Sequence, residues 1–356
     1  MKTLAKLRFG IIGAGGIARS HANALRQLSD VAELVAAADV IPAAAESLQQ
    51  RFGVEALGGE DAISRLLARR DIDAVTLATP SGLHSEQAVQ ALDAGKHCLS
   101  EKPIAITLEQ ADAMIAAQRR TGKALGCVFQ ARYEPASVIV KRAITEGRMG
   151  RIVHANAYLK WYRAQEYYDA GGWRGTWRMD GGGALMNQSV HKVDLVQYLA
   201  GPVATVNGYA GTLAHRIETE DVAVAAVRFQ NGALGTIEGM TNALPNAYTR
   251  VEVYGTEGSA TIVNERLATY YTRSEAPPVK EGEKPVTDLA PEVLARFEGE
   301  HPGWRTGHVA VLADFIQSVQ EGRDAPVNAI EARKAVEIIL AVYRSSREGI
   351  EVRLSL

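Results

Sequence analysis

Hydrophobic positions recur along the chain in a pattern that changes near residue 128. Before this point, short and nearly continuous apolar runs are separated by segments of helix length. This alternation is typical of βαβ units and of a parallel sheet that helices cover on both faces. The predicted strands span residues 7–14, 33–39, 73–79, 96–100 and 123–129, and the predicted helices span residues 17–28, 42–52, 62–68, 84–94 and 108–120. We therefore expect residues 1–128 to form an α/β domain with a doubly wound parallel sheet.

After residue 128, apolar and polar residues alternate with the period of half-buried strands. Hairpin signals such as Asn231-Gly232 interrupt the alternation, which favours a large, mostly antiparallel open sheet. The expected strands lie in residues 151–162, 202–211, 222–239 and 250–263, and the expected helices in residues 135–146, 307–320 and 329–346. Residues 274–300, with their prolines and mixed charges, are expected to form a surface excursion. We therefore expect residues 129–356 to form an α+β domain, and we leave open whether its C-terminal helices pack on the first domain.

The sequence GAGGIA, at residues 13–18, follows the first predicted strand and opens the first predicted helix. Gly13 permits a tight turn, Gly15 lets the backbone approach a pyrophosphate, and Ala18 allows close packing of helix on strand. Asp39 ends the second predicted strand, at the spacing expected of a carboxylate that binds a ribose 2′-hydroxyl. The pattern favours a dinucleotide site over a glycine turn that binds nothing. Because Asp39 repels a 2′-phosphate and no arginine directly follows it, NAD is favoured over NADP.

A second loop, ATPSGLH, joins the strand at residues 73–79 to the next helix. Ligands of such sheets bind outside the carboxyl ends of the strands, so Thr79, Pro80 and His84 are expected to border the cofactor. In the alternative interpretation the segment is an ordinary helix start, with Ser81 as its cap and His84 exposed. This segment alone supports both interpretations equally.

The segment SEKP follows the strand at residues 96–100. Pro103 disfavours the helical conformation at Lys102 and holds this lysine extended at the carboxyl edge of the sheet. The Lys102-Pro103 bond is also of the kind in which cis peptides are common. Alternatively, Lys102 is a solvated residue at a strand end that pairs with Glu101.

Triple glycine precedes ALMNQSVHKVDL, which has a helical period. A helix here places Asn187 and His191 four residues apart on one face, with Asp194 nearby. Histidine exchanges protons near neutral pH, and the amide of Asn187 can orient either His191 or a substrate hydroxyl. Without further context, the pattern is more typical of a buried histidine that has Asp194 as its structural partner.

Composition narrows the classes of function. Apolar residues make up 47% of the chain and charged residues 22%, as in a globular protein that does not span membranes. The formal net charge of −2 and the lack of a basic run argue against a nucleic-acid partner. Cys98 and Cys127 are the two cysteines and lie in apolar, strand-like segments, which favours a reducing, cytoplasmic location. No clustered set of metal ligands is evident.

In their order and spacing, these motifs resemble those of the Gfo/Idh/MocA oxidoreductases, named for glucose-fructose oxidoreductase and inositol dehydrogenase. The motifs are GAGGIA with Asp39, ATPSGLH, SEKP and GGG…NQSVHKVDL, and the resemblance covers essentially the whole chain. It implies an N-terminal Rossmann domain and a C-terminal domain that binds substrate and builds dimers or tetramers. The cofactor residues that it implies are Gly13, Gly15, Gly16, Ile17, Asp39, Thr79, Pro80, His84, Glu101 and Lys102.

The resemblance also implies roles for single residues. Lys102 would contact both nicotinamide ribose and substrate, and His191 would be the catalytic histidine. Asn187 departs from the inositol-dehydrogenase pattern, which has aspartate at this position, and an amide cannot act as a carboxylate base. This departure weakens an assignment of inositol as the substrate.

Residues 158–178 form the densest aromatic region of the chain. Aromatic faces such as that of Trp173 suit a sugar ring, and Arg163, Arg174 and Arg178 suit hydroxyls or a phosphate. A subunit interface or the hydrophobic backing of the sheet explains the same residues equally well.

Together these features predict an NAD-dependent dehydrogenase that oxidises a ring hydroxyl of a sugar, cyclic polyol or sugar derivative. His191 would act as general base, Lys102 would polarise the oxygen, and Asn187 would position it, without a metal. The expected partners are a carbohydrate and further copies of the chain, in a homodimer or homotetramer, without nucleic acid or membrane. Three alternatives stay open: an enzyme that retains NAD through a closed redox cycle, a non-catalytic NAD sensor, and a reductase in the physiological direction.

Overall fold

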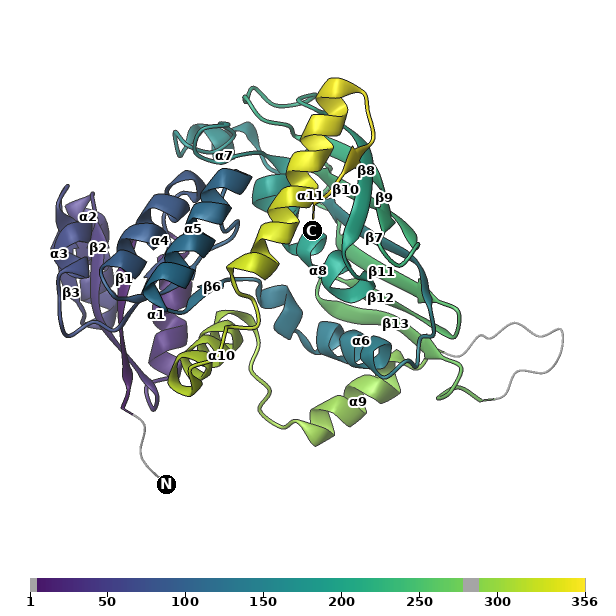
Figure 1. Ribbon diagram of the computed structural model, residues 1–356, viewed down its shortest axis with the longest axis horizontal. Coiled ribbons are helices and arrows are strands. Elements are labelled where there is room, and N and C mark those ends of the chain that lie inside the picture. Colours follow the sequence, from purple (N-terminus) through teal and green to yellow (C-terminus); the bar gives the residue numbers. More distant parts are fainter. Residues whose placement is uncertain (1–4, 278–287, 356) are drawn as a thin grey trace. The chain divides into compact units, whose positions relative to one another are not determined.

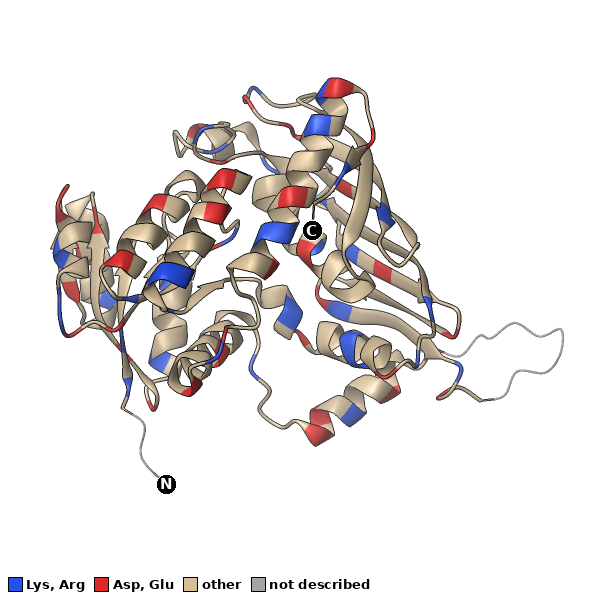
Figure 2. Ribbon diagram, viewed as in Figure 1, with Lys and Arg blue, Asp and Glu red and all other residues tan. Residues whose placement is uncertain are grey.

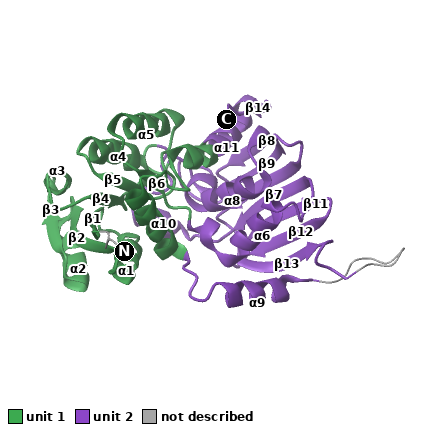
Figure 3. Cartoon of the chain, turned by 60° about the horizontal axis from the view of Figure 1, so that its bottom comes forward, with its two compact units in different colours: residues 1–129, 178–180, 307–336 green, residues 130–177, 181–306, 337–356 purple. Residues whose placement is uncertain are grey.

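The computed structural model describes residues 5–277 and 288–355 of the chain (Figure 1). The chain divides into two compact units (Figure 3). The first unit consists of residues 1–129, 178–180 and 307–336, and the second consists of residues 130–177, 181–306 and 337–356.

Six parallel strands form the sheet of the first unit, in the order β3-β2-β1-β4-β5-β6. The strands are β1 (Leu7–Ile12), β2 (Ala32–Asp39), β3 (Glu55–Gly58), β4 (Ala74–Leu77), β5 (His97–Ser100) and β6 (Leu125–Cys127). The strand order reverses between β1 and β4, so the loops that follow these two strands lie at the switch point where such sheets bind ligands. This topology confirms the predicted doubly wound sheet. The sequence prediction omits β3, because none of its four residues is buried and its hydrophobic signal is weak.

Helices cover both faces of this sheet, with α4 packed against α5 on one face and α1 packed against α10 on the other (Figures 1 and 3). The helices are α1 (Ala18–Gln27), α2 (Pro42–Phe52), α3 (Ala62–Leu67), η1 (Ser81–Leu83), α4 (His84–Asp93), α5 (Leu108–Thr121) and α10 (Gly307–Glu321). Small buried residues such as Ala18 and Ala22 let α1 approach Ile11 of β1 closely. A further helix, α11 (Ala329–Glu348), begins in the first unit and ends in the second. Within the part of the chain that the structure describes, no helix is long and apolar enough to cross a membrane.

Eight strands form the sheet of the second unit, in the order β13-β12-β11-β7-β10-β9-β8-β14. The strands are β7 (Ile152–Lys160), β8 (Val203–Gly211), β9 (Val222–Phe229), β10 (Leu234–Met240), β11 (Thr249–Gly255), β12 (Gly258–Val263), β13 (Arg266–Thr272) and β14 (Val352–Arg353). Only β7 and β10 pair in parallel, and the other neighbours pair antiparallel. The predicted mostly antiparallel sheet is therefore confirmed.

Helices cover one face of the second sheet. The helix α8 (Val190–Ala200) packs on β7 and β11, and α6 (Pro135–Thr145) packs on β12 and β13. On β9, buried residues alternate with the exposed residues Val224, Ala226 and Arg228. This period of two shows that the opposite face of the sheet is open in the single chain.

The prediction of a surface excursion at residues 274–300 is wrong for its C-terminal part. The helix α9 (Ala290–Glu300) packs on β13 and α6, and Val293 and Phe297 are buried one helical turn apart. Neighbouring prolines and charges obscure this short apolar spacing in the sequence. The same segment includes residues 278–287, which lie outside the described residues.

Candidate cofactor and active-site residues

The glycine loop between β1 and α1 is open where a dinucleotide would lie. Gly13 has φ of 90°, and a Cβ there would come within 2.8 Å of the Ala78 carbonyl group, so this turn requires glycine. A Cβ added at Gly15 or Gly16 would meet no atom within 4 Å. The space beside these two residues therefore fits a pyrophosphate close to the backbone and to the amino end of α1.

Asp39, at the end of β2, supports the same loop. Its Oδ2 accepts the Ala14 N–H at 2.6 Å, and its Oδ1 accepts the Ile41 N–H at 2.8 Å. Ile17, the last loop residue before α1, is partly exposed at 38%. The carboxylate thus lies beside the open loop, and its role as a ribose ligand stays a prediction.

His84 connects two of the predicted motifs. Its Nδ1 lies 2.7 Å from the Pro103 carbonyl oxygen, and its Nε2 lies 3.0 Å from the Thr79 carbonyl oxygen. Burial lowers the pKa of His84, so the ring is neutral near pH 7 and donates a hydrogen bond to one carbonyl at a time. The alternative of an exposed histidine at a helix start is wrong, because only 1% of the His84 surface is exposed. Ser81 does not cap α4, which has no side-chain cap.

A buried cluster in the first unit joins Glu101 to His21 and His308. Glu101 Oε1 lies 2.9 Å from Nε2 of each histidine, and its Oε2 accepts the backbone N–H of Lys102 at 3.1 Å. Burial raises the pKa of Glu101, but the hydrogen bonds from the two histidines outweigh it, so this pKa lies well below its usual value. The cluster therefore fixes a carboxylate directly beside the predicted active-site lysine.

These three side chains also have the chemistry of metal ligands. The atoms His21 Nε2, Glu101 Oε1 and His308 Nε2 lie within 4.8 Å of one another. The expectation from the sequence that no ligand set is clustered is therefore wrong, because residues far apart in the chain converge here. Hydrogen bonds engage all three atoms in this structure, so a metal ion bound here would have to replace them.

Lys102 follows this cluster at the carboxyl end of β5. The Lys102-Pro103 peptide bond is cis, one of the two forms that the sequence leaves open. The Glu101 carboxylate receives both histidines and the Lys102 backbone N–H, and both roles that the sequence allows for the Lys102 side chain stay predictions.

In the second unit, Asn187 lies in a π-helix and not in the predicted α-helix. The π-helical segment η3 (Ala184–Ser189) precedes α8, and the Ser189 hydroxyl donates to the Ala184 carbonyl, five residues earlier, at 2.6 Å. His191 lies in the first turn of α8. The predicted α-helix is therefore wrong for residues 184–189, whereas the predicted position of Asn187 and His191 on one face stays a prediction. Such single wide turns occur frequently at functional sites.

Glu220 holds the beginning of this π-helix. Its Oε2 accepts the Gly183 N–H at 2.9 Å, and its Oε1 accepts the Leu185 N–H at 2.7 Å and the Tyr343 hydroxyl at 2.8 Å. Burial raises the pKa of Glu220 to about 7, although the two backbone N–H groups lower it. A Cβ at Gly183 would overlap the Glu220 carbonyl oxygen, and one at Gly182 would overlap the Tyr343 hydroxyl. Close contacts with these two residues thus explain Gly182 and Gly183, and the φ of 72° explains Gly181.

Asp194 has a partner that the sequence does not reveal. Its two carboxylate oxygens accept hydrogen bonds from Arg132 Nε at 2.8 Å and from Arg132 Nη2 at 2.6 Å. Both side chains are buried, and Arg132 also stacks over the Tyr198 ring at 4.5 Å. This two-bond ion pair anchors α8 to the segment after β6.

Two of the arginines predicted to bind a sugar contact the same tyrosine. Arg163 and Arg174 both lie over the Tyr167 ring, and Arg174 also lies over Trp173. Arg178 is exposed and belongs to the first unit. The residues that sequence reasoning missed are Tyr167 and Gln188, which connects Arg163 to Asn187.

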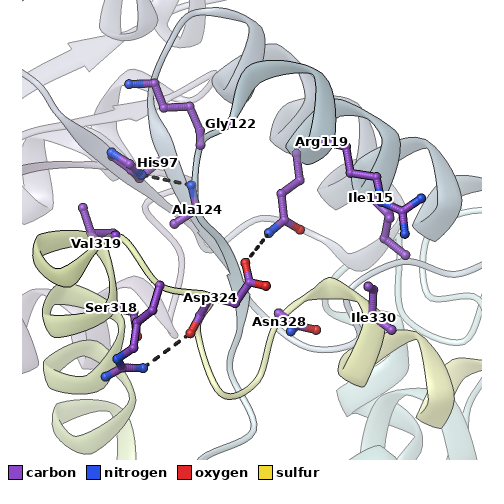
Figure 4. Close-up of a pocket in the computed structure, with 14 residues that line it drawn as sticks. His97, Ile115, Arg119, Gly122, Ala124, Ser318, Val319, Asp324, Asn328 and Ile330 are labelled. Atoms are coloured by element: carbon purple, nitrogen blue, oxygen red, sulfur yellow. Dashed lines mark hydrogen bonds between the residues drawn. The ribbon is translucent and has the colours of Figure 1, made fainter.

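A separate pocket of about 290 Å³ lies in the first unit (Figure 4). It is lined by the residues that link α5 to β6, such as Gly122 and Ala124, and by those that follow α10, such as Asp324. These residues lie at the amino edge of the parallel sheet, whereas the glycine loop lies at the carboxyl edge. The pocket is therefore distinct from the predicted cofactor site.

Comparison with known proteins places the chain in a family. The model for "Oxidoreductase family, NAD-binding Rossmann fold" matches residues 7–129, and the model for "GFO/IDH/MocA C-terminal domain" matches residues 138–261. Levoglucosan dehydrogenase of Pseudarthrobacter phenanthrenivorans is 30% identical over 73% of this chain and 74% of its own length. The scyllo-inositol 2-dehydrogenase (NAD(+)) of Bacillus subtilis is 26% identical over 99% of this chain and 97% of its own length. The crystal structure of the WlbA dehydrogenase from Bordetella pertussis with NADH and UDP-GlcNAcA is 35% identical, covers 99% of both chains and has a TM-score of 0.88.

The fold and these matches define an NAD-dependent oxidoreductase that acts on CH–OH groups. More specifically, the chain belongs to the Gfo/Idh/MocA family. The resemblance of the motifs to this family is therefore confirmed over both parts of the chain.

Proposed function

We propose that this protein is an NAD-dependent dehydrogenase that oxidises a ring hydroxyl of a sugar, cyclic polyol or sugar derivative. The observation that carries the proposal is the open glycine loop beside Asp39, in a chain whose relatives include NAD-dependent dehydrogenases of such rings. A reductase uses the same groups, so the physiological direction depends on the substrates available.

The cofactor preference follows from the charge beside the loop. Two backbone N–H groups hold the Asp39 carboxylate in place, and a fixed negative charge favours ribose hydroxyls over a 2′-phosphate. Space beside Gly15 and Gly16 accommodates a pyrophosphate. When bound, NAD supplies the acceptor for the hydride that leaves the ring carbon.

The chain's own residues move the proton and place the charge. His191 accepts the proton of the substrate hydroxyl, which leaves as the C–H bond breaks. Lys102 holds a positive charge near the developing alkoxide and lowers its free energy. Asn187, whose Oδ1 accepts Gln188 Nε2 at 2.9 Å, orients the substrate oxygen. An amide serves this role without titrating, which suits a positioning residue.

The open face of the second sheet supports a homodimer or homotetramer. Tyr209 of β8 is 73% exposed and Leu234 of β10 is 51% exposed. Apolar residues on an uncovered sheet face mark interaction surfaces. Sedimentation of the purified protein tests this assembly, and a monomer at micromolar concentration would contradict it.

The test of the function is a direct assay with NAD, and separately with NADP, against monosaccharides, inositols, anhydrosugars, sugar acids and nucleotide sugars. We expect absorbance of reduced nicotinamide with one class of ring and with NAD in preference to NADP. No absorbance change with any compound of the panel would refute net dehydrogenation. Tightly held nucleotide in that silent protein would favour a closed redox cycle or a sensor instead.

A further inference from the structure

Two arginines of the second unit converge on one tyrosine. The Cζ atoms of Arg163 and Arg174 lie 5.3 Å and 4.6 Å from the centroid of the Tyr167 ring. Tyr167 lies in the short helix α7 (Gln165–Asp169) and is partly buried. Gly171 makes room for this arrangement, because a Cβ there would come within 2.8 Å of Arg174 Nη1.

The two guanidinium groups lack the counter-charges that many other arginines have. Lysine and arginine are interspersed with acidic residues on the elements of the chain (Figure 2), and buried Arg132 pairs with Asp194. Among the described residues, no aspartate or glutamate forms an ion pair with Arg163 or Arg174. Two like charges that contact one ring repel each other, and a bound anion that both guanidinium groups reach would reduce this cost.

Hydrogen-bonding capacity remains at this position. Arg163 donates to the Tyr162 carbonyl at 3.1 Å and to Gln188 Oε1 at 2.9 Å, which leaves three of its five N–H donors without a partner among the described residues. Nε of Arg174 is buried and has no hydrogen-bond partner within the part of the chain that the structure describes. A ligand oxygen would supply the missing acceptor.

The arginines are connected to the proposed active site by a single side chain. Gln188 Nε2 lies 3.0 Å from the Tyr167 hydroxyl and 2.9 Å from Asn187 Oδ1, while Gln188 Oε1 accepts Arg163. Gln188 and Asn187 are both buried, each with 8% of its surface exposed, and this burial restricts the side chains that make these contacts. A substrate held at Asn187 therefore has the arginines within reach of its other substituents.

We propose that Arg163 and Arg174 form an oxyanion subsite and that the natural substrate is a ring carrying a carboxylate or a phosphate. The proposal rests on the proposed dehydrogenase function, since it takes Asn187 to mark the reacting end. Guanidinium groups bind both kinds of oxyanion through paired N–H donors. Trp161, over which Arg163 also stacks at 4.8 Å, and Trp173 hold the planar groups in position.

The test compares equilibrium binding of D-glucose, D-glucuronate, D-glucose 6-phosphate and UDP-glucose to the NADH-loaded protein by titration calorimetry. At least one charged sugar is expected to bind more tightly than glucose, and Arg174→Gln and Arg163→Gln are each expected to weaken it by about ten- to hundredfold. The loss of affinity for the charged sugar should exceed any loss of affinity for glucose. Arg266→Gln, at an exposed arginine of β13, is the matched control and should leave all four affinities unchanged.

The three charged sugars distinguish a carboxylate, a phosphate ester and a diphosphate as the bound group. The proposal is overturned if no charged sugar binds more tightly than glucose, or if the two arginine variants bind it as tightly as the parent. A change in oligomer mass without a change in affinity would show that the arginines serve a subunit interface. If charged sugars bind through Arg174 but never reduce NAD, the subsite stands and the dehydrogenase proposal fails. If neutral rings are turned over and no charged sugar binds more tightly, the dehydrogenase stands and the subsite fails.

Discussion

The buried carboxyl group of Glu220 should make the second unit less stable as the pH rises. Its pKa lies at about 7, above the ordinary value of 4.5, because burial disfavours the charged form. Between these two pH values the folded chain retains a proton that the unfolded chain has released. The folded state then binds more protons than the unfolded state, so stability decreases with increasing pH.

The expected size of this effect follows from the two pKa values. A tenfold change in proton affinity corresponds to about 1.4 kcal/mol. A rise in pKa from 4.5 to about 7 therefore corresponds to about 3 kcal/mol of stability that is present at low pH and lost above pH 7. Glu220→Gln removes the titrating group but keeps its shape and one acceptor oxygen. The free energy of unfolding of the variant, relative to that of the parent, should therefore increase by about 3 kcal/mol as the pH rises from 4.5 to 8.5.

Urea unfolding followed by tryptophan fluorescence measures this difference. All four tryptophans, Trp161, Trp173, Trp177 and Trp304, belong to the second unit, so their emission reports on the unit that contains Glu220. Other titrating groups affect the parent and the variant alike and cancel in the difference. The control Glu166→Gln, at an exposed residue of α7, should show the same change in the free energy of unfolding with pH as the parent. A stability difference between parent and Glu220→Gln that is the same at pH 5 and pH 8.5 would refute the reasoning.

Three further predictions concern the cofactor and the chemistry. Gly15→Ala should keep the melting temperature but weaken NAD binding by about tenfold or more, since its Cβ would meet only the ligand. Gly13→Ala should instead lower the melting temperature, and equal effects of the two substitutions would contradict the loop geometry. Lys102→Ala and His191→Ala should each lower kcat by about two orders of magnitude, while NAD binding, measured by fluorescence, is retained. Near-normal turnover of the true substrate by the His191 variant would rule out His191 as the general base. Asp39→Asn should narrow the preference for NAD over NADP in kcat/KM, and an unchanged ratio would remove Asp39 from the ribose.

The sequence was sufficient for the parts of the fold that local patterns determine. Apolar runs such as residues 7–14 and glycine spacing at Gly13 and Gly15 predict the parallel sheet and its open loop, because strand burial and turn geometry depend on neighbouring residues. The short strand β3 and the helix α9 were missed because their burial is slight or is provided by segments distant in the chain.

The candidate site depends more on contacts that no local pattern reveals. His21 had one usable signal, since it lies on the face of α1 that buries Ala18, Ala22 and Leu25, where a polar residue needs a partner. Its partner Glu101 is 80 residues away, and His308 lies 207 residues from Glu101, so only the fold could identify them. The π-helix at Asn187 has the same origin, because Glu220, from a distant segment, bonds the backbone that begins it.

The buried carboxylates of Glu101 and Glu220 have a common role, although their environments differ. Glu101 is ionised, bound by two histidines and joined to the backbone of Lys102, whereas Glu220 binds the backbone that leads to Asn187 and His191. Neither needs to exchange a proton with substrate to matter, because each fixes the chain beside a proposed catalytic residue. Loss of either should therefore lower kcat without shifting the pH at which the general base titrates, which separates such positioning residues from the base itself. A shift in that pH on replacing Glu101 by Gln would instead show that the charge of Glu101 acts on the general base.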